Sequence, residues 1–347
     1  MFFVFHSFLQ HPKADCPRYA YVQIHPDGGL GHKMSNWLQS LALCVILSLT
    51  LLHPAFPESL PNNNHFDTTL SRIEEFFGLS AVNITHYDAV ASSISFNRVP
   101  FPIPPATVPQ FASLIPNLQH QVNSVPTCNT VFQFDEYWPN HFRDKPFYTE
   151  PPVDVARLFL THSFLNAHSA TQWLLRTGES PRFNSSHANI AVHIRVGDFV
   201  SFQPQVFKNV LETISSMMKD MCVAFVFHVF LQRSPESESF VREFDHIQPM
   251  HVHMIGPLET FLHFTFADIL VTGGSSMSSL AALISPIPFV FALPEPRGGF
   301  GMISDDHVII NDAGYLSNSG KDRFRAFLVQ RANACYGTGK CAGKITT

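Results

Sequence analysis

Charged side chains are scarce in this chain of 347 residues, of which they make up only 14%. The 22 Lys and Arg residues are scattered instead of forming a stripe, and the formal net charge is -5, so no nucleic-acid partner is expected. Hydrophobic residues make up 45% of the chain and 34 residues are Phe, a composition that predicts a globular chain with a large core and disfavours disorder. The length exceeds what one core usually supports, and we predict two domains, residues 1–180 and 181–347.

The six cysteines include no C-x-x-C pair and no spacing typical of a zinc site, so metal ligation by cysteine is not expected. Cys335 and Cys341 flank five residues near the C-terminus and could close a small disulfide loop. Cys44 and Cys222 lie inside apolar runs, and both are expected to be inert core residues.

Long apolar runs are also missing. Residues 1–9 are apolar but lack a basic region and contain His6, so they are at most a degraded or truncated signal segment. Residues 37–52 are apolar over less than the roughly 20 residues of a bilayer span, and we expect a buried helix followed by a strand; a transmembrane helix is the alternative. Sequons at Asn83 and Asn184 favour the secretory pathway, with a cytoplasmic location and membrane association left open.

Several phosphate-binding and hydrolase signatures are absent. The loop Gly28-Gly29-Leu30-Gly31-His32 has no third glycine at the spacing of the dinucleotide fingerprint. The ATP P-loop requires Gly-Lys followed by Ser or Thr, which Lys33 does not satisfy. No G-x-S-x-G elbow accompanies the serines of the chain, which disfavours a Ser/His/Asp hydrolase that would use Ser276. The glycine loop still lies between an expected strand and an expected helix, where backbone N–H groups can meet phosphates; an ordinary turn is the alternative.

The most informative segment is residues 193–198, His-Ile-Arg-Val-Gly-Asp, which follows the apolar run of residues 190–192. Such a run predicts a buried strand, and the polar side chains would then converge at its carboxyl end, where open α/β sheets bind ligands. The planar guanidinium of Arg195 suits a phosphate or a carboxylate. A structural ion pair between Arg195 and Asp198 is the alternative.

A second polar turn, residues 272–279, follows the expected strand of residues 268–272 and precedes an expected helix. Hydroxyl groups and backbone N–H groups at a helix N-terminus can hold a diphosphate. Simple capping of the helix by Ser276 or Ser278 is the other interpretation.

The second half of the chain alternates strands and helices in the manner of a doubly wound parallel sheet. We predict strands at residues 189–194, 222–231, 251–255, 268–272 and 289–293, and helices at residues 153–176, 204–219, 236–244, 257–266 and 278–285. In the first half, a strand at residues 21–24, the glycine loop, a helix and a strand near residues 49–53 form a βαβ opening, whereas residues 54–152 give few periodic signals. The fold class is therefore α/β.

Together these segments resemble the superfamily of α1,2-, α1,6- and protein O-fucosyltransferases. Residues 193–198 are similar to its H-x-R-x-G/x-D motif, residues 28–32 with the following helix to its first glycine loop, and residues 267–278 to its late nucleotide-site segment. The three motifs occur in the family's order over roughly residues 20–295.

The resemblance implies a GT-B architecture of two Rossmann-like domains facing a cleft, and inverting transfer of fucose from GDP-fucose to a glycan or glycoprotein hydroxyl. It implies no cofactor and no metal, and the chain carries no persuasive D-x-D motif. Without a metal, Arg195 is expected to stabilise the leaving diphosphate. The resemblance further assigns donor contacts to His193, Asp198, Gly29, Gly31, His32, Asp268, Gly274, Ser275 and Ser276.

The chain departs from the family pattern at two motif positions, where Val196 follows the arginine and His32 replaces an asparagine. The donor sugar is therefore open, and so is the acceptor. Asp27, directly before the glycine loop, is the expected general base; a plain Asp-Gly turn is the alternative. A catalytically silent relative that binds a glycan or nucleotide is the second hypothesis. The pair His251 and His253 has ligand-like spacing, but a third ligand is not evident and a structural role is expected.

Overall fold

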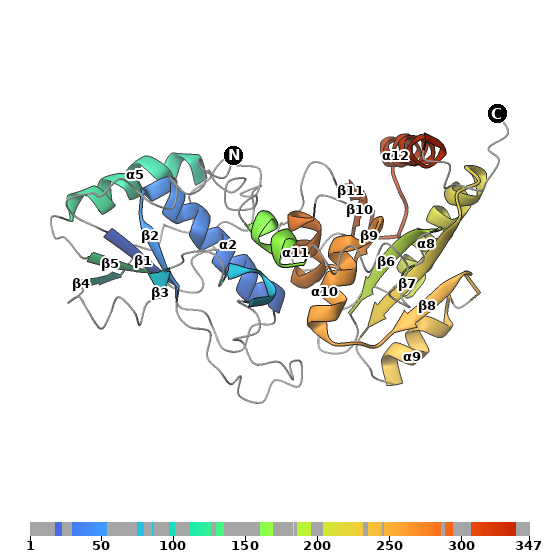
Figure 1. The fold of residues 1–347 in the computed structure, drawn as a ribbon, viewed down its shortest axis with the longest axis horizontal. Helices are drawn as coiled ribbons and strands as arrows, with labels where there is room; N and C mark the ends of the chain where they lie inside the picture. Colours follow the sequence, from blue (N-terminus) through green and yellow to red (C-terminus); the bar gives the residue numbers. More distant parts are fainter. Residues whose placement is uncertain are drawn as a thin grey trace. The chain divides into compact units, whose positions relative to one another are not determined.

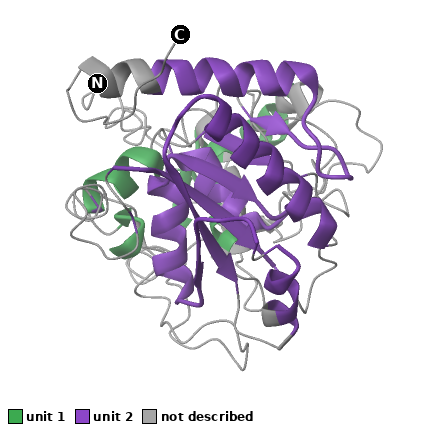
Figure 2. Ribbon diagram, turned by 90° about the vertical axis from the view of Figure 1, so that its right-hand side faces the viewer, with its two compact units in different colours: residues 1–167 green, residues 168–347 purple. Residues whose placement is uncertain are grey.

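The chain folds into two compact units, residues 1–167 and residues 168–347 (Figure 2). Residues 169–182, through which the predicted domain boundary runs, lie outside the residues that the computed structural model describes. The described residues are 18–22, 30–53, 75–79, 85–86, 97–100, 111–125, 130–134, 160–168, 183, 186–195, 204–231, 235–244, 246–285, 289–293 and 307–337.

The first unit contains a parallel sheet of five strands in the order β3-β2-β1-β5-β4 (Figure 1). Its elements are β1 (Arg18–Val22), α2 (Leu30–Leu47), β2 (Thr50–His53), β3 (Thr85–His86), β4 (Asn97–Pro100), α5 (Phe111–Ser124) and β5 (Thr130–Phe134). The expected succession of strand, helix and strand is confirmed, with β1 beginning three residues before the predicted start.

Helix α2 forms part of the core of the first unit. Trp37, Leu38, Leu41 and Ala42 are among its buried side chains, as the apolar run of the sequence predicts. Among the helices that the structure describes, none is both long enough and apolar enough to cross a bilayer.

The second unit contains a parallel sheet of six strands in the order β11-β10-β9-β6-β7-β8. Its elements are β6 (Ala188–Ile194), α8 (Pro204–Asp220), β7 (Phe225–Leu231), α9 (Pro235–Arg242), β8 (Met250–His253), α10 (Pro257–Phe266), β9 (Ile269–Thr272), α11 (Ser276–Ile284), β10 (Phe289–Ala292), β11 (Val308–Ile309) and α12 (Asn318–Gly337). Counted within the unit, this order is 3-2-1-4-5-6 reversed, the order of dinucleotide-binding Rossmann sheets. The predicted α/β class with two parallel sheets is confirmed.

One face of this second sheet packs against α8, α9 and α12. Its core includes Ile190 and Val192 of β6, Phe207 of α8 and Phe324 of α12, all buried. Apolar residues recur every three or four positions along α8, which places them on one side of the helix.

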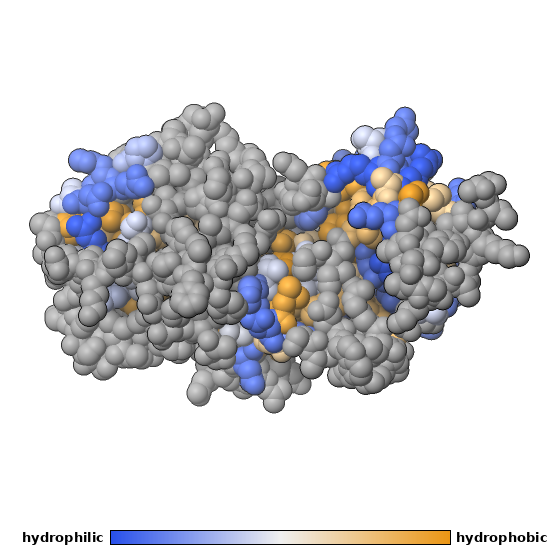
Figure 3. Space-filling model, turned by 45° about the horizontal axis from the view of Figure 1, so that its top comes forward, coloured by the Kyte–Doolittle hydropathy of each residue, from blue (hydrophilic) through white to orange (hydrophobic). Residues whose placement is uncertain are grey.

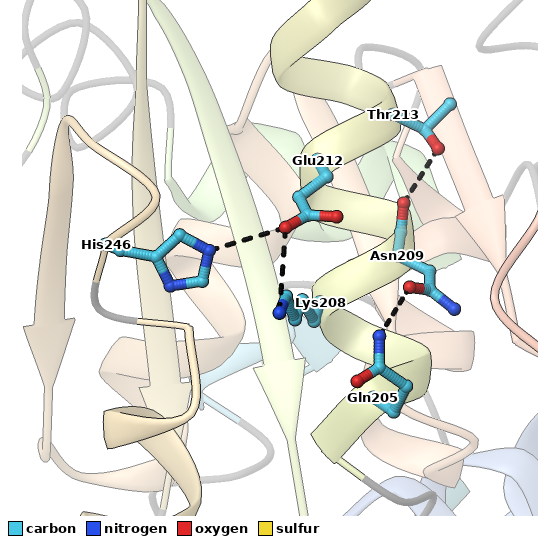
Figure 4. Close-up of polar contacts among 6 residues, drawn as sticks. All are labelled: Gln205, Lys208, Asn209, Glu212, Thr213 and His246. Atoms are coloured by element: carbon cyan, nitrogen blue, oxygen red, sulfur yellow. Dashed lines mark hydrogen bonds and ion pairs between the residues drawn. The ribbon is translucent and has the colours of Figure 1, made fainter.

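The outer side of α8 is polar (Figure 4). Gln205 contacts Asn209, whose carbonyl accepts a hydrogen bond from Thr213, and Glu212 lies 4.0 Å from Lys208 and 3.4 Å from His246. The contacts within α8 join residues four positions apart, whereas His246 reaches Glu212 from outside the helix. Largely exposed contacts of this kind contribute little to stability individually.

The opposite face of the second sheet packs against α10 and α11, which lie on the other side of the strands from α8 (Figure 1). Gly256 and Pro257 begin α10, and Ser275 caps α11. The predicted limits of α10 are confirmed, and α11 begins two residues earlier than expected because the capping serine is Ser275.

Three sequence-based expectations differ from the structure or lie partly outside it. Cys222 is exposed, because it occupies the turn between α8 and β7 with a φ of 53° and β7 begins only at Phe225; Cys44 is buried as expected. Of the helix predicted at residues 153–176, only residues 160–168 are described, and residues 160–167 are helical. Cys335 lies in α12 but its side chain is not described, and Cys341 lies outside the described residues, so their proposed pairing stays a prediction.

Helix α12 was not expected, although its sequence carries a signal for it. The hydroxyl of Ser317 accepts a hydrogen bond from the backbone N–H of Gly320, and Phe324, Phe327 and Leu328 recur at helical spacing. In the space-filling view, hydrophilic residues gather over α12 with apolar ones beside them (Figure 3).

Candidate functional site

The first element of the site is the carboxyl end of β6. His193 is the penultimate residue of this strand, and its side chain is buried on the face covered by α10, where its ring lies 4.9 Å from the ring of Phe264. Arg195 follows the last strand residue and is half-buried. The strand therefore delivers an imidazole and a guanidinium to the edge of the sheet where such folds bind ligands.

The second element is the turn between β9 and α11. Gly274 has a φ of 65°, a conformation that favours glycine, and the hydroxyl of the buried Ser275 accepts a hydrogen bond from the backbone N–H of Met277 at 3.4 Å. Ser276 is the first helical residue and is half-buried. The hydroxyl of Ser275 therefore caps the helix, whereas the alternative interpretation of this turn had named Ser276 or Ser278 as the capping residue. The start of the helix still presents backbone N–H groups.

These two elements are adjacent in space. Strands β6 and β9 pair in parallel, with Val192 opposite Val271. A β-carbon at Gly273 would collide with the backbone carbonyl oxygen of His193, so the glycine turn lies directly against the end of β6. Because β6 and β9 are the first and fourth strands of the unit, the two elements meet where the strand order reverses, which is the usual ligand site of an open α/β sheet.

The electrostatics of this edge separate the roles of its two basic residues. Burial, and to a smaller extent the charge of Arg195, lowers the pKa of His193 from 6.5 to about 3. The imidazole is therefore neutral near pH 7, and its Nδ1 has no hydrogen-bond partner among the described residues. Arg195 supplies the positive charge, and His193 can act there only as a neutral hydrogen-bonding group.

Asp268 lies elsewhere. It precedes β9, at the amino end of the strand, and its carboxylate accepts a hydrogen bond from the backbone N–H of Asn189 at 2.9 Å and lies 2.7 Å from the guanidinium of Arg331. The length of β9 separates it from the turn at Gly274. Its expected contact with a donor stays a prediction, and the site proposed below does not use it.

The remaining predicted site residues are only partly described. Gly31 is buried in the first turn of α2, where His32 follows it, but the side chain of His32 is not described. Asp27, Gly29 and Asp198 lie outside the described residues. Their expected roles therefore stay predictions.

Two residues that the sequence analysis did not assign contribute to the site. Gly273 permits the close approach of the turn to β6, and Phe264 supports the ring of His193. The glycine pair directly after a buried strand was the available signal for Gly273; nothing in the sequence pointed to Phe264. Within the described part of the chain, no group of three or more His, Cys, Asp or Glu side chains is placed to hold a metal ion.

No family model and no curated protein matches the chain. Among solved structures it is similar to POFUT1 in complex with GDP-fucose, with 12% identity, a TM-score of 0.43 and coverage of 82% of this chain and 99% of that one. A mutant of Arabidopsis thaliana FUT1 in complex with GDP has 14% identity and a TM-score of 0.39 over 85% of this chain and 75% of that one. The E. coli heptosyltransferase WaaC with ADP has 11% identity and a TM-score of 0.39 over 90% of this chain and 99% of that one.

Proposed function

We propose that this chain is a metal-independent, inverting glycosyltransferase of the GT-B type, with GDP-fucose as the first donor to test and a glycan or protein hydroxyl as acceptor. The observation that carries the proposal is the contact between Gly273 and the carbonyl of His193. It joins the strand end that carries Arg195 to the N-terminus of α11 at the reversal point of a parallel sheet. An arginine beside a helix N-terminus suits the negative charge of a nucleotide diphosphate.

The proposed chemistry follows from these charges. The acceptor oxygen forms a bond to the anomeric carbon of the sugar as the bond from that carbon to the β-phosphate oxygen breaks. The bonding electrons and the negative charge pass to the leaving diphosphate, where Arg195 and the N–H groups at the start of α11 stabilise them. The acceptor proton passes to a base, for which Asp27 is the candidate. Attack from the face opposite the leaving group inverts the configuration.

Calorimetric titration tests donor binding. The panel is GDP, GDP-fucose, ADP, ADP-heptose, UDP and UDP-N-acetylglucosamine, each with and without EDTA. We expect one guanine or adenine nucleotide to bind with unchanged affinity in EDTA, and Arg195→Ala to weaken binding at least tenfold. Arg325→Ala is the matched control, because Arg325 is an exposed residue of α12 paired with Asp322. Absence of binding by the whole panel would refute the proposal.

Turnover is tested separately by following release of the free nucleotide in the presence of mixed glycan and peptide acceptors. Binding without any release would favour the silent, nucleotide-binding relative. If release is seen, Asp27→Asn should reduce its rate far more than it reduces nucleotide affinity, because a general base acts on the acceptor and not on the diphosphate.

We also propose a location in the secretory pathway, which rests on the sequons at Asn83 and Asn184. Expression in eukaryotic cells with and without a glycosidase that removes N-glycans tests it. A glycan-dependent mobility shift that Asn83→Gln and Asn184→Gln together abolish is expected, and an unshifted protein would contradict it.

A further inference from the structure

A network of largely buried polar groups runs through the second unit, away from the turn at Gly274. Asp268 contacts Arg331 of α12 on one side and Asn189 of β6 on the other. The side-chain oxygen of Asn189 lies 3.2 Å from Nε2 of His228, and Nδ1 of His228 lies 3.0 Å from Nε2 of His253. This polar network thus links α12 to the edge strand β8.

Along this polar network, the contacts of Asn189 fix which group donates and which accepts each hydrogen bond. The amide nitrogen of Asn189 donates to the carbonyl of His187 and to Asp268, so its oxygen faces His228 as an acceptor. His228 must then carry its proton on Nε2, and its Nδ1 accepts the hydrogen bond that Nε2 of His253 donates. A second proton on His228 would make both ring nitrogens donors, so that His253 could keep the hydrogen bond only by moving its own proton to Nδ1, and it would place a charge on a buried ring.

We propose that the hydrogen bond between His228 and His253 is an acid-sensitive lock on the edge of the second sheet, closed while His228 is neutral and opened, with release of β8, when His228 gains a proton. This proposal goes beyond the proposed function and does not depend on it.

Strand β8 pairs with the rest of the sheet on one side only, through its backbone ladder with β7. It is a four-residue strand at the sheet edge, and Val252 and the following Met254 are exposed. His253 is half-buried and stacks on Phe230 of β7, with ring centroids 4.8 Å apart. A short edge strand without a fully buried side chain is among the parts of a fold that open most readily.

The groups that face His228 disfavour a positive charge there. His251 and His253 face it from β8 and His263 from α10, and the apolar ring of Phe183 covers it. On the β6 side, Asn189 stands between it and Asp268, whose charge Arg331 already balances. In α10, Nδ1 of His263 lies 2.7 Å from the backbone carbonyl of Glu259, whose side chain is exposed.

Burial and these neighbouring imidazoles lower the pKa of His228 from 6.5 to about 3. A group whose pKa is lower in the closed state than in the open state favours the open state as the pH falls below the ordinary value of 6.5. The equilibrium between closed and open forms then shifts by up to tenfold for each pH unit between 6.5 and 3.

Hydrogen exchange of the full chain tests the lock. Protection factors of amides 250–253, corrected for the intrinsic effect of pH, should fall about tenfold in the wild type between pH 7.0 and pH 5.5. His228→Gln keeps a donor toward Asn189 but cannot gain a charge, and its protection should stay constant. His246→Gln, which removes an exposed histidine that is not part of this polar network, should respond as the wild type does.

An equal loss of protection in wild type and His228→Gln would overturn the proposal, and so would a constant protection in His246→Gln. If His228→Gln does not fold, NMR of the imidazole nitrogens of the wild type gives the answer. A neutral His228 with its proton on Nε2 at pH 5.5 in the folded form is expected, and a doubly protonated ring in that form would overturn the lock.

Discussion

The glycine turn at Gly273 rests on the backbone of His193, with no room for a β-carbon between them. Two segments some 80 residues apart therefore touch at the carboxyl edge of the second sheet. This contact sets the spacing between the strand that carries Arg195 and the helix capped by Ser275, and it makes the position of residue 273 directly testable.

Gly273→Ala should weaken both folding and nucleotide binding. The added methyl group meets rigid backbone and forces β6 and the turn apart, at a cost of about 1–3 kcal/mol in the free energy of unfolding. Urea denaturation and calorimetry measure the two effects. Gly256→Ala is the matched control, because a β-carbon there meets no atom within 4 Å; as a change at the N-cap of α10 it should cost no more than about 1 kcal/mol and leave nucleotide binding unaltered. Equal behaviour of the two variants would show that the contact with His193 is unimportant.

Ser275→Ala removes the cap of α11. The backbone N–H of Met277 loses its acceptor, and the free energy of unfolding should fall by about 1 kcal/mol. Ser275→Thr retains a hydroxyl and should lose less. Denaturant midpoints at constant pH decide this, and an alanine variant as stable as the wild type would mean that the hydroxyl does not cap the helix.

Arg331→Met breaks a largely buried ion pair. It leaves the carboxylate of Asp268 without its cation, and the free energy of unfolding should fall by about 3 kcal/mol. Arg325→Met removes an exposed arginine from the same helix, where ion pairs contribute less than about 1 kcal/mol. A thermal or urea comparison of the two variants tests this difference, which would vanish if α12 were not fastened through Asp268.

His193→Phe should make the fold less sensitive to acid. The pKa of His193 is about 3 in the folded chain and 6.5 in its ordinary state, so the unfolded chain binds more protons and folding weakens as the pH falls from 6.5 towards 3. Phenylalanine retains a ring against Phe264 and does not titrate. Between pH 7 and pH 5 the variant should lose about 2 kcal/mol less stability than the wild type.

Urea denaturation at these two pH values measures the difference. His246→Gln is the control, since this histidine is exposed, and its stability should follow the wild-type dependence on pH. If His193→Phe and the wild type lose the same stability, the pKa of His193 is not lowered in the folded chain.

Much of the second sheet could be predicted from local sequence. Helices α8 and α10 have apolar residues at helical spacing, and the apolar run of residues 190–192 in the fully buried strand β6 is typical of a parallel sheet covered on both faces. The prediction was weaker where local signals conflict: α5 contains Pro116, and β7 begins after a turn at Cys222 that resembles a strand in composition.

By itself the sequence determined the α/β class, the alternation of strands and helices, and the polar residues at the ends of β6 and β9, because these follow from spacing along the chain. Only the tertiary structure decided that β6 lies beside β9, that Gly273 touches His193, and that Asp268 pairs with Asn189, which is 79 positions away. Local periodicity records which face of a strand is apolar. It does not record which strand becomes its neighbour, because that depends on how the connecting helices pack across the whole sheet.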